Sequence, residues 1–170
     1  MLATLLQNLG QVAHRQGNLQ DARTLYDESL STAHELGDPW MVASTLGGLA
    51  GLAASTRRPD EARTAALLSG AMEATLEATG ARLDPLDLRD YEANVSAART
   101  ALGEGAWQAA WVEGHAVTLE EAVELGRHAA YELEREPLVE QIVDGATPAE
   151  ARCAGSGRLQ RPSAAPCGVA

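Results

Sequence analysis

The feature that most constrains this chain is a two-helix pattern that recurs 40 residues further along. Residues 21–24 read Asp-Ala-Arg-Thr, and residues 61–64 read Glu-Ala-Arg-Thr. Within each unit, apolar residues recur every three or four positions in two segments, which is the spacing of one helical face. Because periods of roughly 34 to 47 residues built from helices are typical of α-solenoids, the sequence predicts stacked antiparallel helix pairs.

Residues that begin or end helices mark the boundaries of these segments. Gly17 is expected just past the first helix, and Asn18 is expected to cap the second. Residues 37–39, Gly-Asp-Pro, close the first unit, because proline is tolerated in the first turn of a new helix. The second unit is then predicted as helices over residues 40–55 and 60–79.

The apolar residues of each helix predict which side faces the core. In the first helix this side holds Leu5, Leu6, Leu9, Val12 and Ala13. In the second helix it holds Ala22, Leu25, Tyr26, Leu30 and Ala33. The first helix also starts with apolar residues where a terminal repeat needs a polar cap, so the N-terminal side of the stack is expected to be uncapped.

Several positions of the first unit resemble a tetratricopeptide repeat (TPR). Leu9-Gly10, Gly17, Ala22 and Tyr26 stand where that family has Leu-Gly, a glycine, an alanine and an aromatic residue. The expected structural positions of both units are Leu9, Gly10, Gly17, Ala22, Tyr26, Leu49, Ala50 and Ala62. The resemblance implies an all-α, TPR-like α-solenoid that serves protein–protein interaction or signal regulation.

A longer resemblance extends over roughly residues 1–130. Residues 58–74 are followed by a proline loop, by residues 91–103 and then by residues 110–123. In this order they resemble the C-terminal sensor arm of LuxR/MalT-like ATP-binding transcriptional regulators of actinobacteria. The resemblance implies a bacterial signal-transduction protein without its ATPase and DNA-binding parts. Its partner would be another protein or the parent regulator's own ATPase domain.

Composition divides the chain into three parts. Residues 1–80 hold the two helix pairs, and residues 81–136 are expected to form an irregular helical cap region. Residues 137–170 begin with a short apolar stretch and continue in Gly, Ala, Pro, Ser and Arg without a period, which predicts a flexible, disordered tail. Residues 146–150 resemble the opening of a LuxR-type helix-turn-helix that does not continue. A truncated or frame-shifted gene and an ordinary tail both fit this pattern.

The charge of the chain argues against nucleic acid as a direct partner. The net charge is −11, and because the tail from Gly145 carries +2, residues 1–144 carry −13. Nucleic-acid affinity depends on neutralising phosphates with positive side chains, which this part of the chain does not favour. The apolar runs are far shorter than the ~20 residues that cross a bilayer, and the N-terminus lacks a secretory signal pattern. A cytoplasmic location without membrane contact is expected.

No set of residues favours catalysis, a cofactor or a metal. All 13 basic residues other than histidine are Arg, so the lysine of a phosphate-binding loop is missing. Cys153 and Cys167 lack the short spacing of zinc ligands and are interpreted as free thiols. Glu120, Glu124 and His128 share one helix face, but this pattern is more typical of a solvated face.

Trp107, Trp111 and His115 lie four residues apart and share one side of an expected helix. We interpret them as packing between a short helix and the end of the solenoid, which is the commoner use of large aromatic residues. The alternative is a small-molecule or metal sensing domain that uses these three side chains.

The partner surface is expected on the concave side of the solenoid, which first helices line. The candidate partner-binding residues there are Asn8, Gln11, Arg15, Thr45 and Gly48.

Overall fold

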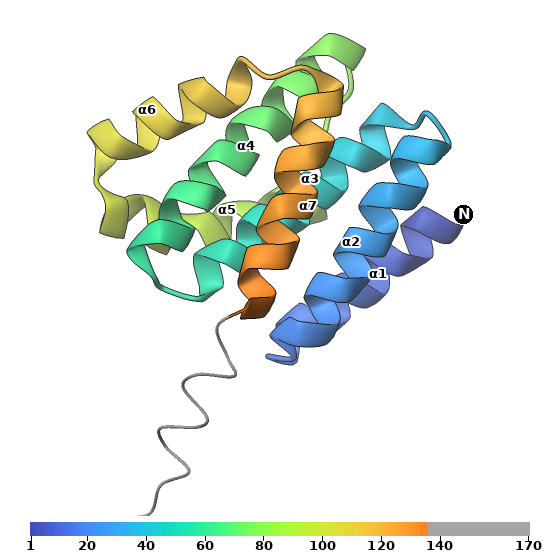
Figure 1. Ribbon diagram of the computed structural model, residues 1–170, viewed down its shortest axis with the longest axis horizontal. Helices are drawn as coiled ribbons and strands as arrows, with labels where there is room; N and C mark the ends of the chain where they lie inside the picture. Colours follow the sequence, from blue (N-terminus) through green and yellow to red (C-terminus); the bar gives the residue numbers. More distant parts are fainter. Residues whose placement is uncertain (136–170) are drawn as a thin grey trace, which may run out of the picture. The chain divides into compact units, whose positions relative to one another are not determined.

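Seven α-helices follow one another along residues 1–135, which are the residues that the computed structural model describes (Figure 1). Their bounds are α1 (Leu2–Arg15), α2 (Leu19–Glu35), α3 (Pro39–Ser55), α4 (Pro59–Thr79), α5 (Pro85–Leu102), α6 (Glu104–His115) and α7 (Leu119–Arg135). No strand occurs in this range, so the all-α prediction is confirmed. The tail predicted for residues 137–170 lies outside the described residues.

Local chemistry sets the helix boundaries, much as the sequence predicts. The Asn18 side chain accepts a hydrogen bond from the Asp21 backbone N–H at the start of α2. Asp38 does the same for Met41 at the start of α3, where Pro39 occupies the first turn. Both caps supply an acceptor to a backbone N–H that has no partner inside its helix.

Two antiparallel hairpins, α1–α2 and α3–α4, stack through the contact of α2 with α3. Tyr26 of α2, which is 1% exposed, lies between them. A Cβ atom built on Gly10 of α1 would come within 2.8 Å of its ring, and one built on Gly48 of α3 within 2.7 Å. Glycine at both positions therefore lets three helices close around one aromatic ring, as in a TPR-like solenoid.

Helix α3 forms the centre of the core. Nearly all of its side chains are buried, and it contacts α1, α2, α4, α5 and α7. Leu46, Leu49 and Leu52 are each at most 1% exposed and pack with Leu30 of α2 and Leu68 of α4 in the same cluster. Burying a leucine side chain stabilises a fold by about 1.5–3 kcal/mol, so the burial of these residues contributes substantially to stability.

The prediction for the core-facing side of the first helix is wrong at Leu5, Leu9 and Val12, which are 56%, 55% and 46% exposed. The buried side of α1 instead carries mainly small and polar residues. The Ala3 carbonyl accepts a hydrogen bond from the Ser29 hydroxyl at 2.9 Å. Close approach of α2 requires such a side, because bulky residues would hold the two helices apart.

The C-terminal helices do not continue the hairpin pattern, which agrees with the predicted irregular end. Helix α6 packs along α4 rather than along α5. A Cβ atom on Gly70 of α4 would lie 2.1 Å from the Trp111 carbonyl oxygen, and one on Gly114 of α6 would lie 1.9 Å from that of Leu67. The backbones of α4 and α6 therefore touch directly.

Helix α7 returns toward the first hairpin and contacts α2, α3 and α4 (Figure 1). Thr118 and Glu121 form a capping box at its start, with the Thr118 N–H donating to Glu121 at 2.8 Å and the Glu121 N–H donating to Thr118 at 3.3 Å. Gly126 faces Leu30 and Leu46, whose methyl groups would lie within 3 Å of an added Cβ atom. This glycine lets α7 close over the core.

Candidate functional site: a groove between three helices

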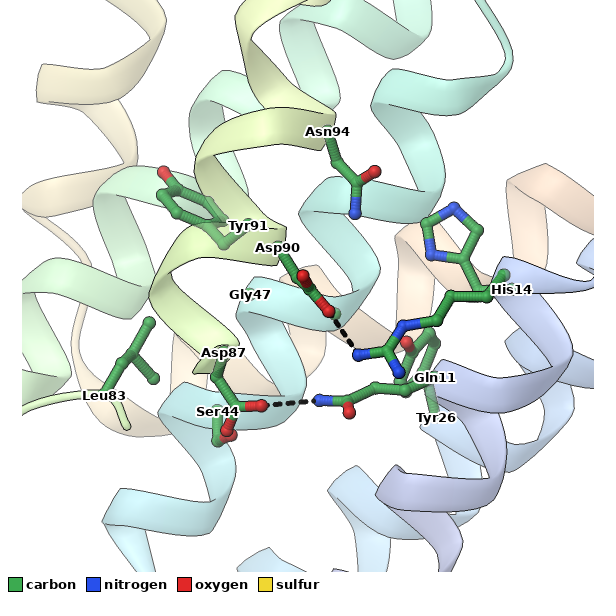
Figure 2. A pocket seen from close by; sticks show the side chains of 12 residues that line it. Gln11, His14, Tyr26, Ser44, Gly47, Leu83, Asp87, Asp90, Tyr91 and Asn94 are labelled. Atoms are coloured by element: carbon green, nitrogen blue, oxygen red, sulfur yellow. Dashed lines mark hydrogen bonds and ion pairs between the residues drawn. The ribbon is translucent and has the colours of Figure 1, made fainter. Parts of the chain in front are cut away.

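Side chains from α1, α3 and α5 surround a small cavity of about 40 Å³ (Figure 2). This is enough room for roughly one water molecule. We call this surface the three-helix groove and define it by Gln11, Arg15, Ser44, Asp87, Asp90 and Asn94. A wider, open depression over α1 and α5 adjoins it, shares His14, Arg15, Asp90 and Asn94, and is also lined by Arg89 and Ala93.

Polar contacts across the groove join α1 to α5. The Gln11 amide donates to the Asp87 carboxylate at 3.0 Å, and the Arg15 guanidinium pairs with Asp90 (Figure 2). The Arg15 side chain is 55% exposed and that of Asp90 is 29% exposed. Exposed ion pairs of this kind stabilise by about 0–1 kcal/mol, so the pair can open at low cost.

Three ring side chains that line the groove are uncharged near neutral pH. Burial raises the pKa of the Tyr91 phenol to about 12 and also raises that of Tyr26. Burial, followed by the charge of Arg15, lowers the pKa of the His14 imidazole. The lining of the groove thus combines neutral rings with carboxylate, guanidinium and amide groups.

The five predicted partner-binding residues differ in their exposure and in their contacts. Asn8 is exposed, whereas Gln11 and Arg15 are engaged with α5. Thr45 is fully buried, donates to the Met41 carbonyl at 2.9 Å and lies 3.1 Å from the Ser29 hydroxyl. Gly48 lies against Tyr26 and lines the cavity. Thr45 is therefore not available to a partner in this structure.

Sequence reasoning missed the contribution of α5, namely Asp87, Asp90 and Asn94. A signal for it exists, because α5 begins with Asp84-Pro85 just as α3 begins with Asp38-Pro39. If Asp84-Pro85 marks the first helix of a third unit, α5 is expected to lie beside α3 in the stack. The groove then lies among three successive first helices.

The tryptophan region is used in packing α6 against the solenoid. Trp107 is 4% exposed. The rings of Trp111 and His115 lie 4.7 Å apart between centroids at an interplanar angle of 32°. The His115 ring nitrogen lies 3.1 Å from a carboxylate oxygen of Glu77 on α4. The contact of His115 with Glu77 joins α6 to α4, and both tryptophans pack in or against the core.

The acidic residues of α7 that the structure describes make local contacts. Glu124 lies 3.6 Å from Arg127 and Glu121 caps the helix. Across the described part of the chain, no group of three or more His, Cys, Asp or Glu side chains is placed to hold a metal ion. Within the same residues, every helix is too short or too polar to cross a membrane.

The tetratricopeptide repeat family matches residues 1–67, which run from α1 into the first half of α4. Comparison with curated proteins found no match, and comparison with solved structures found none. The stacked hairpins and the family match agree on the same residues, so residues 1–67 are a tetratricopeptide-repeat region.

Proposed function

We propose that this chain is a non-catalytic helical-repeat module for protein–protein interaction or signal regulation, and that its partner binds in the three-helix groove. The observation that carries the proposal is that three successive first helices line one groove, to which α1 and α5 contribute partly exposed polar side chains and α3 contributes the buried Ser44. The tetratricopeptide-repeat region supplies two of these helices, and such repeats generally mediate protein–protein interaction.

The chemistry of the groove favours a peptide with basic side chains. Asp87 and Asp90 supply carboxylates, and Asn94 supplies an amide that can pair with a peptide backbone. An arginine or lysine of the partner would replace Arg15 at Asp90, an exchange that costs little because the pair is exposed. The charge of −13 over residues 1–144 would also steer a basic partner toward this chain.

The proposal is tested with an array of 12-residue peptides probed with the purified chain. We expect the bound peptides to be rich in Arg and Lys, and Asp90→Asn to weaken them about fivefold, which corresponds to roughly 1 kcal/mol. Glu92→Gln is the matched control, because it removes one exposed carboxylate from the same helix outside the groove. Equal binding by the two variants, or no peptide preference, would contradict the groove as the site.

We further propose that the parent protein is a LuxR/MalT-like regulator, with this chain as part of its C-terminal sensor arm in the cytoplasm. The motif order over residues 58–123 supports this assignment. In this sensor arm, residues 1–80 would provide the stacked repeats, and residues 81–136 would cover the C-terminal end of the stack. The ATPase part of the regulator would then be the partner. Genomic DNA that encodes an ATPase before Met1 and a helix-turn-helix in another frame after Glu150 would support it, and unrelated flanking genes would count against it.

The alternative of a small-molecule or metal sensing domain is not supported by the structure. It requires Trp107, Trp111 and His115 to form a ligand pocket, whereas these side chains take part in the packing of α6.

A further inference from the structure

An apolar stripe runs along the outer side of α1. Leu2, Leu5, Leu9 and Val12 are 59%, 56%, 55% and 46% exposed. Their spacing of three, four and three residues is that of the a and d positions in a coiled-coil heptad. Single exposed leucines need no explanation, but a regular stripe of four on one helix marks an interaction surface. We call these four residues the α1 stripe.

The internal repeat shows that this side of the helix is built to receive another helix. Forty residues later, the matched positions of α3 are Val42, Thr45, Leu49 and Leu52, each at most 1% exposed. The contact between Ser29 and Thr45 shows that α2 lies over this side of α3. The same side of α1 has no covering helix within residues 1–135.

The distribution of acidic residues favours a second copy of the chain as the partner of the α1 stripe. Among the described helices only α1 and α3 contain no acidic residue, and α3 is the core. Two copies of a chain with net charge −11 repel each other wherever carboxylates would face carboxylates. Contact through α1 brings two acid-free helices together, so the stripe is suited to a second copy of itself.

The stripe is also complementary to itself in shape and polarity. In an antiparallel pairing, Leu2 lies opposite Val12 of the second copy, and Leu5 lies opposite Leu9. Every pair is then apolar, as a two-fold symmetric interface requires. The antiparallel arrangement also places the N-terminal end of each helix dipole beside the C-terminal end of the other.

A helix of the α2 type fits this surface less well. On α3, the glycine at position 48 makes room for Tyr26, and an added Cβ atom would lie 2.7 Å from the ring. The matched position of α1 is Asn8, which carries a full side chain. On α1, the exposed Asn8 side chain therefore stands where the repeat leaves room for the Tyr26 ring on α3.

We propose that two copies of this chain form a symmetric dimer by packing their α1 stripes against each other. One helix pair buries less than the roughly 800 Å² per partner of a standard interface. The dimer is therefore reversible and depends on concentration. It leaves the three-helix groove, on another side of α1, open for a partner.

Sedimentation velocity of the full chain over about 5 to 500 μM tests the proposal, since this range brackets micromolar dissociation constants. We expect the wild-type protein to shift from monomer to dimer across the series. Leu5→Glu should raise the dimer dissociation constant at least tenfold, because it buries a carboxylate at the centre of the apolar seam. Val112→Glu is the control, since Val112 is 52% exposed on α6, away from the stripe.

Circular dichroism of both variants checks that they remain folded, as the exposure of Leu5 and Val112 predicts. A wild-type protein that stays monomeric at every concentration would overturn the proposal. This result is also the one expected if the α1 stripe binds a different protein instead of a second copy. Equal dimerisation of Leu5→Glu and Val112→Glu would also overturn it. Asp90→Asn is expected to leave the dimer unchanged, so failure of the groove and failure of the stripe are distinguishable.

Discussion

Tyr26 shows how one side chain sets the distance between three helices. Its ring lies between Gly10 of α1 and Gly48 of α3, where even a methyl group would come closer than 3 Å. Burial raises the pKa of its phenol, because the charged form would lose its hydration. The repeat can keep a large aromatic residue at this point only because the facing helices carry no side chain there.

His14 is a second residue whose chemistry depends on its position. Burial and then the positive charge of Arg15 lower its pKa from the ordinary value of 6.5. The unfolded chain therefore binds protons more readily than the folded chain once the pH drops below 6.5, and stability falls from there toward the folded pKa.

We expect urea denaturation at a series of pH values to show this loss of unfolding free energy in the wild-type protein. His14→Gln should remove part of the loss below pH 6.5 and should not alter the pH dependence above about 7.5, where the imidazole is neutral in both states. Identical pH dependence of the two proteins below pH 6.5 would show that His14 titrates alike in the folded and unfolded chains.

Among the elements, helix boundaries were predictable and helix partners were less so. Asn18, Asp38-Pro39 and Thr118 mark helix starts through local chemistry that any chain must satisfy. The exposed side of α1 was not predictable, because an apolar stripe looks the same whether it faces the core of its own chain or awaits another helix. The close pairing of α6 with α4 also depends on Gly70 and Gly114, which are far apart in the sequence.

The direct contact between α4 and α6 can be tested by substituting glycines of α6. Gly114→Ala places a Cβ atom 1.9 Å from the Leu67 carbonyl oxygen, where backbone must move, whereas Gly105→Ala meets nothing within 4 Å. We expect Gly114→Ala to lower the free energy of unfolding by at least about 2 kcal/mol. Gly105→Ala should raise it slightly, through the better helix propensity of alanine. Urea denaturation of both variants checks this, and similar stability of the two would refute direct contact between α4 and α6.

At the scale of the whole described unit, the site depends on residues distant in the sequence. Gln11 and Asp87 are 76 positions apart, yet their side chains meet across the groove. The α1 side of the groove, with Gln11 and Arg15, followed from the repeat register. The α5 side did not, because its repeat match is confined to the Asp-Pro pair at the helix start. Thr45 was misplaced because α2 covers its side of α3.

The central claim is that a partner binds in the three-helix groove, and NMR chemical-shift mapping tests it most directly. A ¹⁵N-labelled chain is titrated with a basic peptide selected from the array. We predict that the largest amide shifts fall on the groove-lining parts of α1, α3 and α5, including Gln11, Gly48 and Asn94. Shifts confined to α6 and α7, with the groove unchanged, would contradict the claim.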